Sequence, residues 1–181
     1  MTHVDLISHE TATGPAGDTL QRIDSAFGTV PAMFQAVANS PAALNSMWGS
    51  FGALSQGTLG AAIGEQIAVA VANRNSCEYC LAAHTALGRK ADVSVEVLAD
   101  AQEGRSDDPR IEALLQFALA VVDERGHITA AQLAAVRRHG WSDEAIVETM
   151  AHVALNLFTN YVNVALDVPV DFPAVSLRHA A

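Results

Sequence analysis

Residues 65–84 read EQIAVAVANRNSCEYCLAAH, and this stretch decides the fold class. Its first part, 65–72, alternates valine with alanine, which is compatible with a short strand. We favour a helix, because alanine is a strong helix former and no other segment has the pattern of a partner strand. The polar run 73–76 interrupts the pattern. Ser76 can cap a second helix that begins at Cys77 and ends at Gly88. The stretch therefore predicts two helices joined by a tight turn.

The segments on either side carry further helix signals. Pro31 and Pro41 suit first helical positions, and Asp108, which precedes a proline, has the pattern of a helix start. Thr129 and Ser142 are placed to cap the last two helices. We expect the helices outside the central hairpin at residues 18–28, 31–39, 41–55, 94–102, 109–124, 130–138 and 143–166.

These elements predict an all-α fold. No repeat, linker or low-complexity segment divides the chain, so we expect residues 18–181 to form one helical domain. Residues 1–17 lack periodicity and are predicted to form a flexible N-terminal arm. Half of the 181 residues are apolar, which is enough for a core without a structural metal or disulfides.

The charge and the cysteines limit the possible partners. Ten Lys and Arg against twenty Asp and Glu give a net charge of −10. Such a field repels phosphate backbones and anionic lipid, so we expect neither nucleic acid nor membranes as partners. The sequence shows neither a secretory signal pattern nor an apolar run of about 18 residues. The only two cysteines lie three positions apart, which fits redox or metal chemistry in a reducing compartment. We therefore expect a cytoplasmic protein.

The two cysteines and a histidine share one face of the second helix. Residues three or four apart are helical neighbours, so Cys77 lies beside Cys80, and Cys80 beside His84. Only a thiolate attacks peroxides or disulfides, and an adjacent imidazole can remove the thiol proton. The predicted hairpin can bring Glu65 back to His84, where a carboxylate would orient the ring and stabilise its charged form. The motif thus predicts a thiol redox centre.

Two other interpretations of the motif remain open. The cysteines could be small core residues, although their restriction to one motif argues against this. The same four side chains could bind zinc, but structural zinc sites usually add a second Cys/His pair and none is present. The sequence also lacks a Gly-x-Gly-x-x-Gly nucleotide motif. We therefore expect neither a metal nor a cofactor.

The pattern Glu-x11-Cys-x2-Cys-x3-His resembles the signature of the alkylhydroperoxidase D-like and carboxymuconolactone decarboxylase family. Softer similarities flank it, in the segment GTVPAMF at 28–34 with Ser40-Pro41, in NLFTN at 156–160, and in the tail VPVDFP at 168–173. The resemblance thus covers most of residues 28–173. It implies a thiol-dependent peroxidase or disulfide reductase that takes a small hydroperoxide and a thiol or protein electron donor. It also implies a homo-oligomer, trimeric or hexameric.

Carried over to this chain, the resemblance makes Cys80 the attacking thiolate and Cys77 the resolving thiol. It makes His84 and Glu65 the proton relay. The better-studied members have a further histidine just before the second cysteine, where this chain has Tyr79. A neutral phenol cannot replace an imidazole base near pH 7, so the proton relay that the resemblance implies is one member short in this chain. Helix position alone would favour Cys77 as the nucleophile, because the dipole lowers the pKa of a thiol at a helix start.

A row of polar residues on the last predicted helix is the second notable feature. His152, Asn156, Asn160 and Asn163 follow one another at spacings of 4, 4 and 3 in an otherwise apolar segment. A solvated stripe is the commoner explanation of such a row. The alternative is a polar strip that faces the redox pocket or a subunit interface, with His152 and Asn156, like Tyr79, as supporting site residues.

Two other functions compete with the thiol oxidoreductase. One is a decarboxylase- or lactonase-like enzyme of the same family, whose chemistry does not depend on a cysteine pair. The other is a non-catalytic redox sensor or oligomeric binding protein, in which the disulfide only changes the shape of the molecule. Turnover with a peroxide and a recycling dithiol separates this last possibility from the enzyme.

Overall fold

The computed structural model describes residues 2–178; Met1 and residues 179–181, the outer ends of the two predicted segments, lie outside the described part. Within that part the secondary structure consists of nine α-helices and no strand, which confirms the predicted all-α class. The helices are α1 (Gly14–Phe27), α2 (Ala32–Val37), α3 (Pro41–Leu54), α4 (Gly60–Arg74), α5 (Glu78–Lys90), α6 (Val95–Ala101), α7 (Pro109–Asp123), α8 (Ala130–Arg138) and α9 (Asp143–Ala165).

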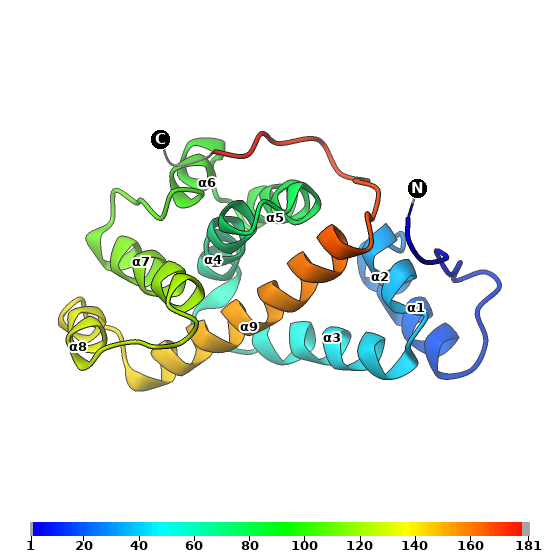
Figure 1. Ribbon diagram of the computed structural model, residues 1–181, viewed down its shortest axis with the longest axis horizontal. Helices are drawn as coiled ribbons and strands as arrows, with labels where there is room; N and C mark the ends of the chain where they lie inside the picture. Colours follow the sequence, from blue (N-terminus) through cyan, green and yellow to red (C-terminus); the bar gives the residue numbers. More distant parts are fainter. Residues whose placement is uncertain (1, 179–181) are drawn as a thin grey trace.

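The α4–α5 hairpin forms the centre of the bundle. Figure 1 shows α9 crossing beneath the hairpin, with α3 below α9, α1 and α2 at one end and α7 and α8 at the other. Every residue of 66–73 in α4 is buried. A helix that is apolar all round is stable only when it is enclosed, and this is why the Val-Ala alternation folds as a central helix. The competing strand interpretation is wrong.

Most predicted helix starts are correct, because the predicted caps are made. Asp108 accepts a hydrogen bond from the amide of Arg110 (2.8 Å), and Thr129 forms a reciprocal capping box with Gln132. Ser142 accepts from the amide of Ala145 (3.2 Å). These caps hold α7, α8 and α9 close to their predicted positions.

Three predicted boundaries are wrong. The first helix begins at Gly14, before Asp18, because Pro15 already occupies its first turn, where a missing N–H costs nothing. Gly88 does not end α5, which continues to Lys90. A Cβ at Gly88 would lie 2.7 Å from Leu98 of α6, so this glycine permits close helix packing. Ser76 does not cap α5, since it has φ 54° and the cap is Cys77.

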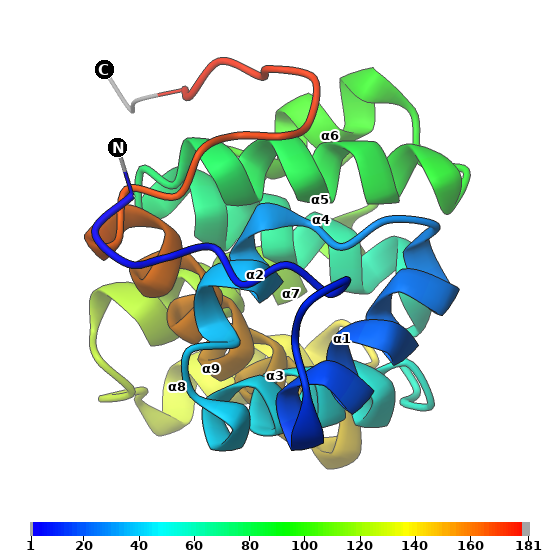
Figure 2. The ribbon, with the colours of Figure 1, turned by 90° about the vertical axis from the view of Figure 1, so that its right-hand side faces the viewer.

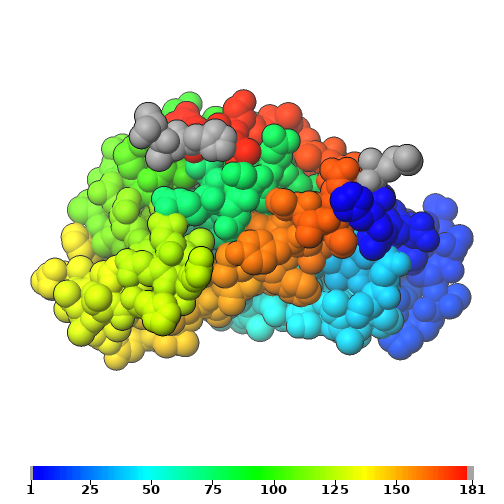
Figure 3. All heavy atoms as spheres, in the orientation of Figure 1, coloured from blue at the N-terminus to red at the C-terminus, as the bar shows by residue number. Residues whose placement is uncertain are grey.

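The two chain ends lie against the bundle. His3 donates from its amide to the carbonyl of Leu166 (2.9 Å), and the amide of Ile7 donates to Gln35 (3.1 Å). After α9 the chain turns back and runs over α5 toward α6, as both ribbon views show (Figure 2). The space-filling view shows this segment along one edge of the molecule and the outer side of α9 uncovered below it (Figure 3).

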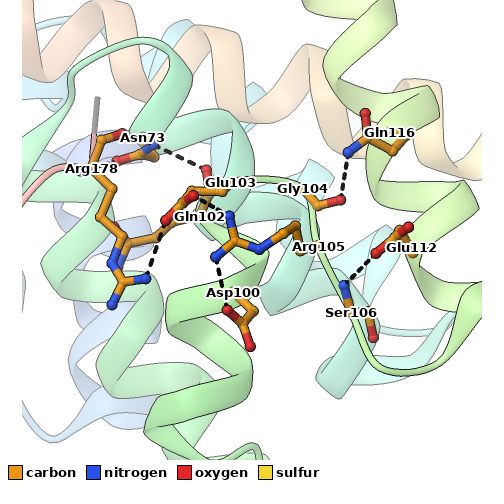
Figure 4. Close-up of polar contacts among 10 residues, drawn as sticks. All are labelled: Asn73, Asp100, Gln102, Glu103, Gly104, Arg105, Ser106, Glu112, Gln116 and Arg178. Carbon is orange, nitrogen blue, oxygen red and sulfur yellow. Dashed lines mark hydrogen bonds and ion pairs between the residues drawn. The ribbon is translucent and has the colours of Figure 1, made fainter. Parts of the chain in front are cut away.

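A polar network fixes the C-terminal segment to α4 and α6 (Figure 4). Asn73 donates to the carbonyl of Arg178 (2.6 Å), and the amide of Arg178 donates back to the Asn73 side chain (2.8 Å). The same asparagine donates to the carbonyl of Gln102 (3.0 Å), while Arg178 pairs with Glu103 (3.2 Å). The tail that carries Asp171 and Phe172 is therefore held at both ends.

No helix in the described part has the length and hydropathy needed to cross a membrane.

Candidate functional site

The turn between α4 and α5 positions the two cysteines. Ser76 has a left-handed backbone, and the amide of Cys77 donates to the carbonyl of Ala72 (2.9 Å). Cys77 thereby becomes the N-cap of α5, and its Sγ accepts from the amide of Cys80 (3.2 Å). Both thiols are free and buried, with 1% of Cys77 and 2% of Cys80 exposed. The cysteines are neighbours, as the spacing predicts, but one is a cap and the other lies within the first helical turn.

The hairpin also brings Glu65 to His84. Glu65 Oε2 lies 2.8 Å from His84 Nδ1, and both side chains are largely buried. Burial by itself lowers the pKa of His84, but the charge of Glu65 and its hydrogen bond outweigh burial and raise the pKa. Because Nδ1 is engaged by the carboxylate, the ring has a fixed orientation. The arrangement favours an imidazolium next to Cys80.

The Cys80 thiol is acidic for a buried group. Burial raises its pKa, but the hydrogen bond from the Cys77 thiol, the charge of His84 and the amides of Asn163 and Asn160 together lower it from 9.0 to about 7. Asn163 Nδ2 donates to Cys80 Sγ over 3.1 Å. The pKa of Cys77 is instead raised far above its ordinary value, first by its hydrogen bond with Cys80 and then by burial. Near neutral pH the thiolate therefore resides on Cys80.

An apolar cavity of about 470 Å³ opens in front of Cys80. Cys80, His84 and Glu65 line it, whereas the buried Cys77 is not among its lining residues. The wall is mostly aromatic and aliphatic, and its Phe, Trp and Tyr members come from α1, α2, α3, α5 and the C-terminal tail: Phe27, Phe34, Trp48, Phe51, Tyr79 and Phe172. Phe34 meets both Trp48 and Phe51 edge to face, with ring centroids 5.8 and 6.0 Å apart. The cavity therefore has room for a ring-sized apolar molecule beside Cys80.

Tyr79 forms part of the wall of this cavity. Its hydroxyl accepts a hydrogen bond from the amide of Met33 (3.2 Å), and its ring lies edge-on to Phe172 with centroids 5.7 Å apart. Burial raises the pKa of Tyr79 well above its ordinary value, so the phenol stays neutral. Beside it, Asp171 accepts from the amide of Ala32 (2.7 Å). Tyr79 thus ties α5 to the tail and to the start of α2.

The polar row on α9 is not a solvated stripe, so that interpretation is wrong. Asn156, Asn160 and Asn163 are 4%, 0% and 3% exposed. They point toward the hairpin because α9 packs directly beneath α4 and α5. Asn156 donates to the carbonyl of His152 (2.9 Å) and lines the cavity.

His152 lines the same cavity. Its ring packs over Gly64, where an added Cβ would lie 3.0 Å from Cε1. Its Nε2 lies 3.9 Å from Glu148, whose carboxylate accepts from the amides of Thr58 (2.8 Å) and Leu59 (3.0 Å). Burial lowers the pKa of His152, so it is neutral near pH 7.

Sequence reasoning did not identify Asn160 and Asn163 as site residues, although it identified the row that contains them. The 4-4-3 spacing was the available signal, but it does not show which side of α9 packs inward. In residues 2–178 no group of three or more His, Cys, Asp or Glu side chains is arranged to hold a metal ion.

The helical hairpin and its thiol pair define the class of protein to which this chain is similar. A model of the carboxymuconolactone decarboxylase family matches residues 41–124. The matched residues run from α3 through α7 and include Glu65 and the Cys77–His84 motif. The resemblance found in the sequence is confirmed. No protein of curated function matches the chain.

Solved structures show the same fold. An uncharacterized peroxidase-related protein from Ralstonia eutropha JMP134, described as an alkylhydroperoxidase AhpD core, superposes with a TM-score of 0.85 at 24% identity, covering 94% of this chain and 92% of that one. A peroxidase-related protein from Silicibacter sp. TM1040 gives 0.81 at 24% identity, covering 93% and 91%. A cysteine-to-alanine variant of the debrominase Bmp8 in complex with 2,3,4-tribromopyrrole gives 0.80 at 20% identity, covering 94% and 92%.

Proposed function

We propose that the chain is a thiol-dependent oxidoreductase that reduces a small organic hydroperoxide through Cys80. One observation carries the proposal: Cys80 is the cysteine that faces the cavity, and it is also the one whose pKa is lowered to about 7. The helix-dipole argument for Cys77 loses its force, because Cys77 is enclosed and its pKa is raised.

The reaction follows from the positions of the two thiols and His84. The Cys80 thiolate attacks the terminal peroxide oxygen, the O–O bond breaks, and the departing alkoxide takes a proton from the His84 imidazolium. The products are an alcohol and a sulfenic acid on Cys80. Cys77 then attacks the Cys80 sulfur, the S–OH bond breaks, and the hydroxide leaves as water with the Cys77 proton. The resulting disulfide accepts two electrons from an external dithiol, which restores both thiols.

The cavity favours an apolar substrate over an anionic one. None of the described residues that line it is Lys or Arg, and Glu65 adds a carboxylate to the wall. An anionic substrate such as a carboxylate would find only the His84 imidazolium there, and Glu65 already pairs with it. The cavity therefore gives less support to the decarboxylase alternative than to a neutral organic hydroperoxide.

Turnover with a bulky apolar hydroperoxide tests this proposal. Cumene hydroperoxide with dithiothreitol as the recycling donor should be consumed catalytically, and faster than hydrogen peroxide. Without the donor, one equivalent should remove two thiols. Stoichiometric thiol loss without turnover would instead support the redox sensor. Bromide release from 2,3,4-tribromopyrrole, without peroxide consumption, would point to a different electrophile and overturn the peroxidase.

We also propose a cytoplasmic homo-oligomer. A buried dithiol that must be recycled suits a reducing compartment. The outer side of α9 exposes large apolar residues, with Val147, Tyr161 and Val164 at 64%, 60% and 55% exposure. Exposed apolar side chains gathered on one helix are typical of a surface that another subunit covers.

A further inference from the structure

Two buried amides approach the reactive sulfur from α9. Asn163 Nδ2 donates to Cys80 Sγ over 3.1 Å. Asn160, one helical turn earlier, is fully buried, and its amide also lowers the pKa of Cys80. Both side chains therefore act on one atom, the sulfur of Cys80.

The orientation of Asn160 is fixed from the opposite side. Asn75, the C-cap of α4, donates from Nδ2 to Asn160 Oδ1 over 2.9 Å. Because the oxygen of Asn160 is thereby occupied, its amide nitrogen is turned away from Asn75. Among the described residues this nitrogen has no hydrogen-bond partner. A buried N–H without an acceptor is costly, and such groups in native proteins call for an explanation.

A thiolate supplies the missing acceptor. A protonated thiol is a weak acceptor, whereas a sulfur that carries a full negative charge accepts several strong hydrogen bonds. At Cys80, helix α9 presents the amide donors of Asn160 and Asn163, and none of its described residues places a charged group in contact with the sulfur. The titratable groups around Cys80 come from elsewhere: Cys77, Tyr79 and His84 from the α5 segment, and Glu65 from α4 behind His84. Asp171 acts on Tyr79, and His152 acts on His84 from further along α9.

We propose that Asn160 and Asn163 form an amide cradle that binds the Cys80 thiolate, with Asn75 as the residue that positions Asn160. The amides are neutral donors, so they stabilise the charged sulfur without placing a second acid beside it. They also leave the leaving-group proton to His84 alone, because an amide does not donate its proton to an alkoxide. The proposal uses the proposed function only for the role of Cys80 as the attacking sulfur.

The test is the ionisation of Cys80 in the absence of any peroxide. Thiolate absorbance near 240 nm is followed against pH; since the pKa of Cys77 is raised far above its ordinary range, the step near neutral pH reports Cys80. Asn163→Leu removes the donor, and Asn163→Asp keeps the shape but places a carboxylate oxygen against the sulfur. Both should raise the pKa of Cys80 above its value of about 7. A hydrogen bond to a charged group is strong enough for the thiolate fraction at pH 7 to fall about 5- to 50-fold.

Asn160→Leu should shift the ionisation in the same direction, and Asn75→Ala should shift it less, because it only frees the Asn160 amide to rotate. Thr149→Val is the matched control, since Thr149 is a buried polar residue of α9 that bonds the carbonyl of Ala145 (2.8 Å) and lies away from the cavity. It should leave the ionisation of Cys80 unchanged. Wild-type ionisation in folded Asn163→Asp overturns the proposal, whether or not Asn163→Leu folds.

The outcome for the cradle is separate from the outcome for the proposed function. If the variants shift the Cys80 ionisation and the wild type consumes no hydroperoxide, the cradle is supported and the peroxidase is not. If the wild type turns over hydroperoxide and Asn163→Asp has wild-type ionisation, the peroxidase is supported and the cradle is overturned. At high pH, where every variant is ionised, alkylation by iodoacetamide should reach at least the wild-type rate. A variant that is merely misfolded would not recover in this way.

Discussion

Replacing His84 with glutamine separates two roles that the proposed reaction gives to this residue. The imidazolium lowers the pKa of Cys80 by its charge, and in the proposed reaction it is also the acid that protonates the departing alkoxide. Glutamine keeps a polar side chain of similar size but carries neither the charge nor an acidic proton. The two losses have different magnitudes and different pH dependences.

The loss of charge is the smaller effect. If the pKa of Cys80 returns from about 7 to its ordinary value of 9.0, the thiolate fraction at pH 7 falls about 50-fold. A more basic thiolate is a better nucleophile, so each thiolate reacts about 8-fold faster, which offsets part of this loss. Alkylation by iodoacetamide, which needs no acid, should therefore slow only about 6-fold at pH 7 and recover above pH 9.

The loss of the acid is larger and does not recover at high pH. A positioned general acid typically contributes about 10²- to 10⁴-fold to the rate. Single-turnover oxidation of His84→Gln by cumene hydroperoxide should be slowed by at least that factor at pH 7 and remain slow at pH 10. Stopped-flow measurement of both reactions across pH distinguishes the roles. Wild-type peroxide kinetics in folded His84→Gln would refute the relay, and parallel recovery of both reactions at high pH would leave His84 only an electrostatic role.

Three further predictions concern the surroundings of the site. Because the pKa of His84 is raised in the folded protein, its ion pair with Glu65 stabilises the fold fully below the unfolded pKa of 6.5 and less as the pH rises through the folded pKa. Glu65→Gln should therefore lower the free energy of unfolding by about 1–3 kcal/mol near pH 5.5 and by less near pH 9, as measured by urea titration; an equal loss at both values would contradict the pairing. Gly88→Ala should lower the free energy of unfolding by about 1–3 kcal/mol in the same assay, because its Cβ would lie 2.7 Å from Leu98. An unchanged urea midpoint would show that α6 can move to accommodate the methyl group without loss of stability. Light scattering at micromolar concentration should give a mass in solution that is a multiple of 19.0 kDa, and Tyr161→Lys should shift this mass toward that of the monomer. A wild-type protein with the mass of a monomer would contradict the proposed homo-oligomer.

Much of the fold could be predicted from local chemistry. Caps such as Asp108, Thr129 and Ser142 act within one helical turn, so their side chains mark helix starts without knowledge of the rest of the chain. Gly88 was misjudged for the opposite reason. Whether a glycine ends a helix or admits a neighbour depends on another element, here Leu98 of α6.

The same distinction between local and tertiary features separates the site residues that could be predicted from those that could not. The neighbours of Cys80 within the hairpin follow from spacing and a short turn, so Glu65, Cys77 and His84 could be found in the sequence. The amides of Asn160 and Asn163 could not be assigned, because the contact of Asn163 with Cys80 spans some eighty residues and the burial of both amides depends on which face of α9 packs inward. The cavity is also a tertiary feature, since its aromatic wall comes from helices distant in the sequence and from the tail.

The central claim is that Cys80, and not Cys77, is the sulfur that attacks. The most direct test treats Cys77→Ser and Cys80→Ser with one equivalent of cumene hydroperoxide in the presence of dimedone, followed by mass analysis of the peptides. Cys77→Ser should carry one dimedone adduct on Cys80, because the sulfenic acid forms and cannot be resolved. In the Cys80→Ser variant, Cys77 should remain an unmodified thiol. A dimedone adduct on Cys77 in Cys80→Ser, with Cys80 unmodified in Cys77→Ser, would contradict the assignment.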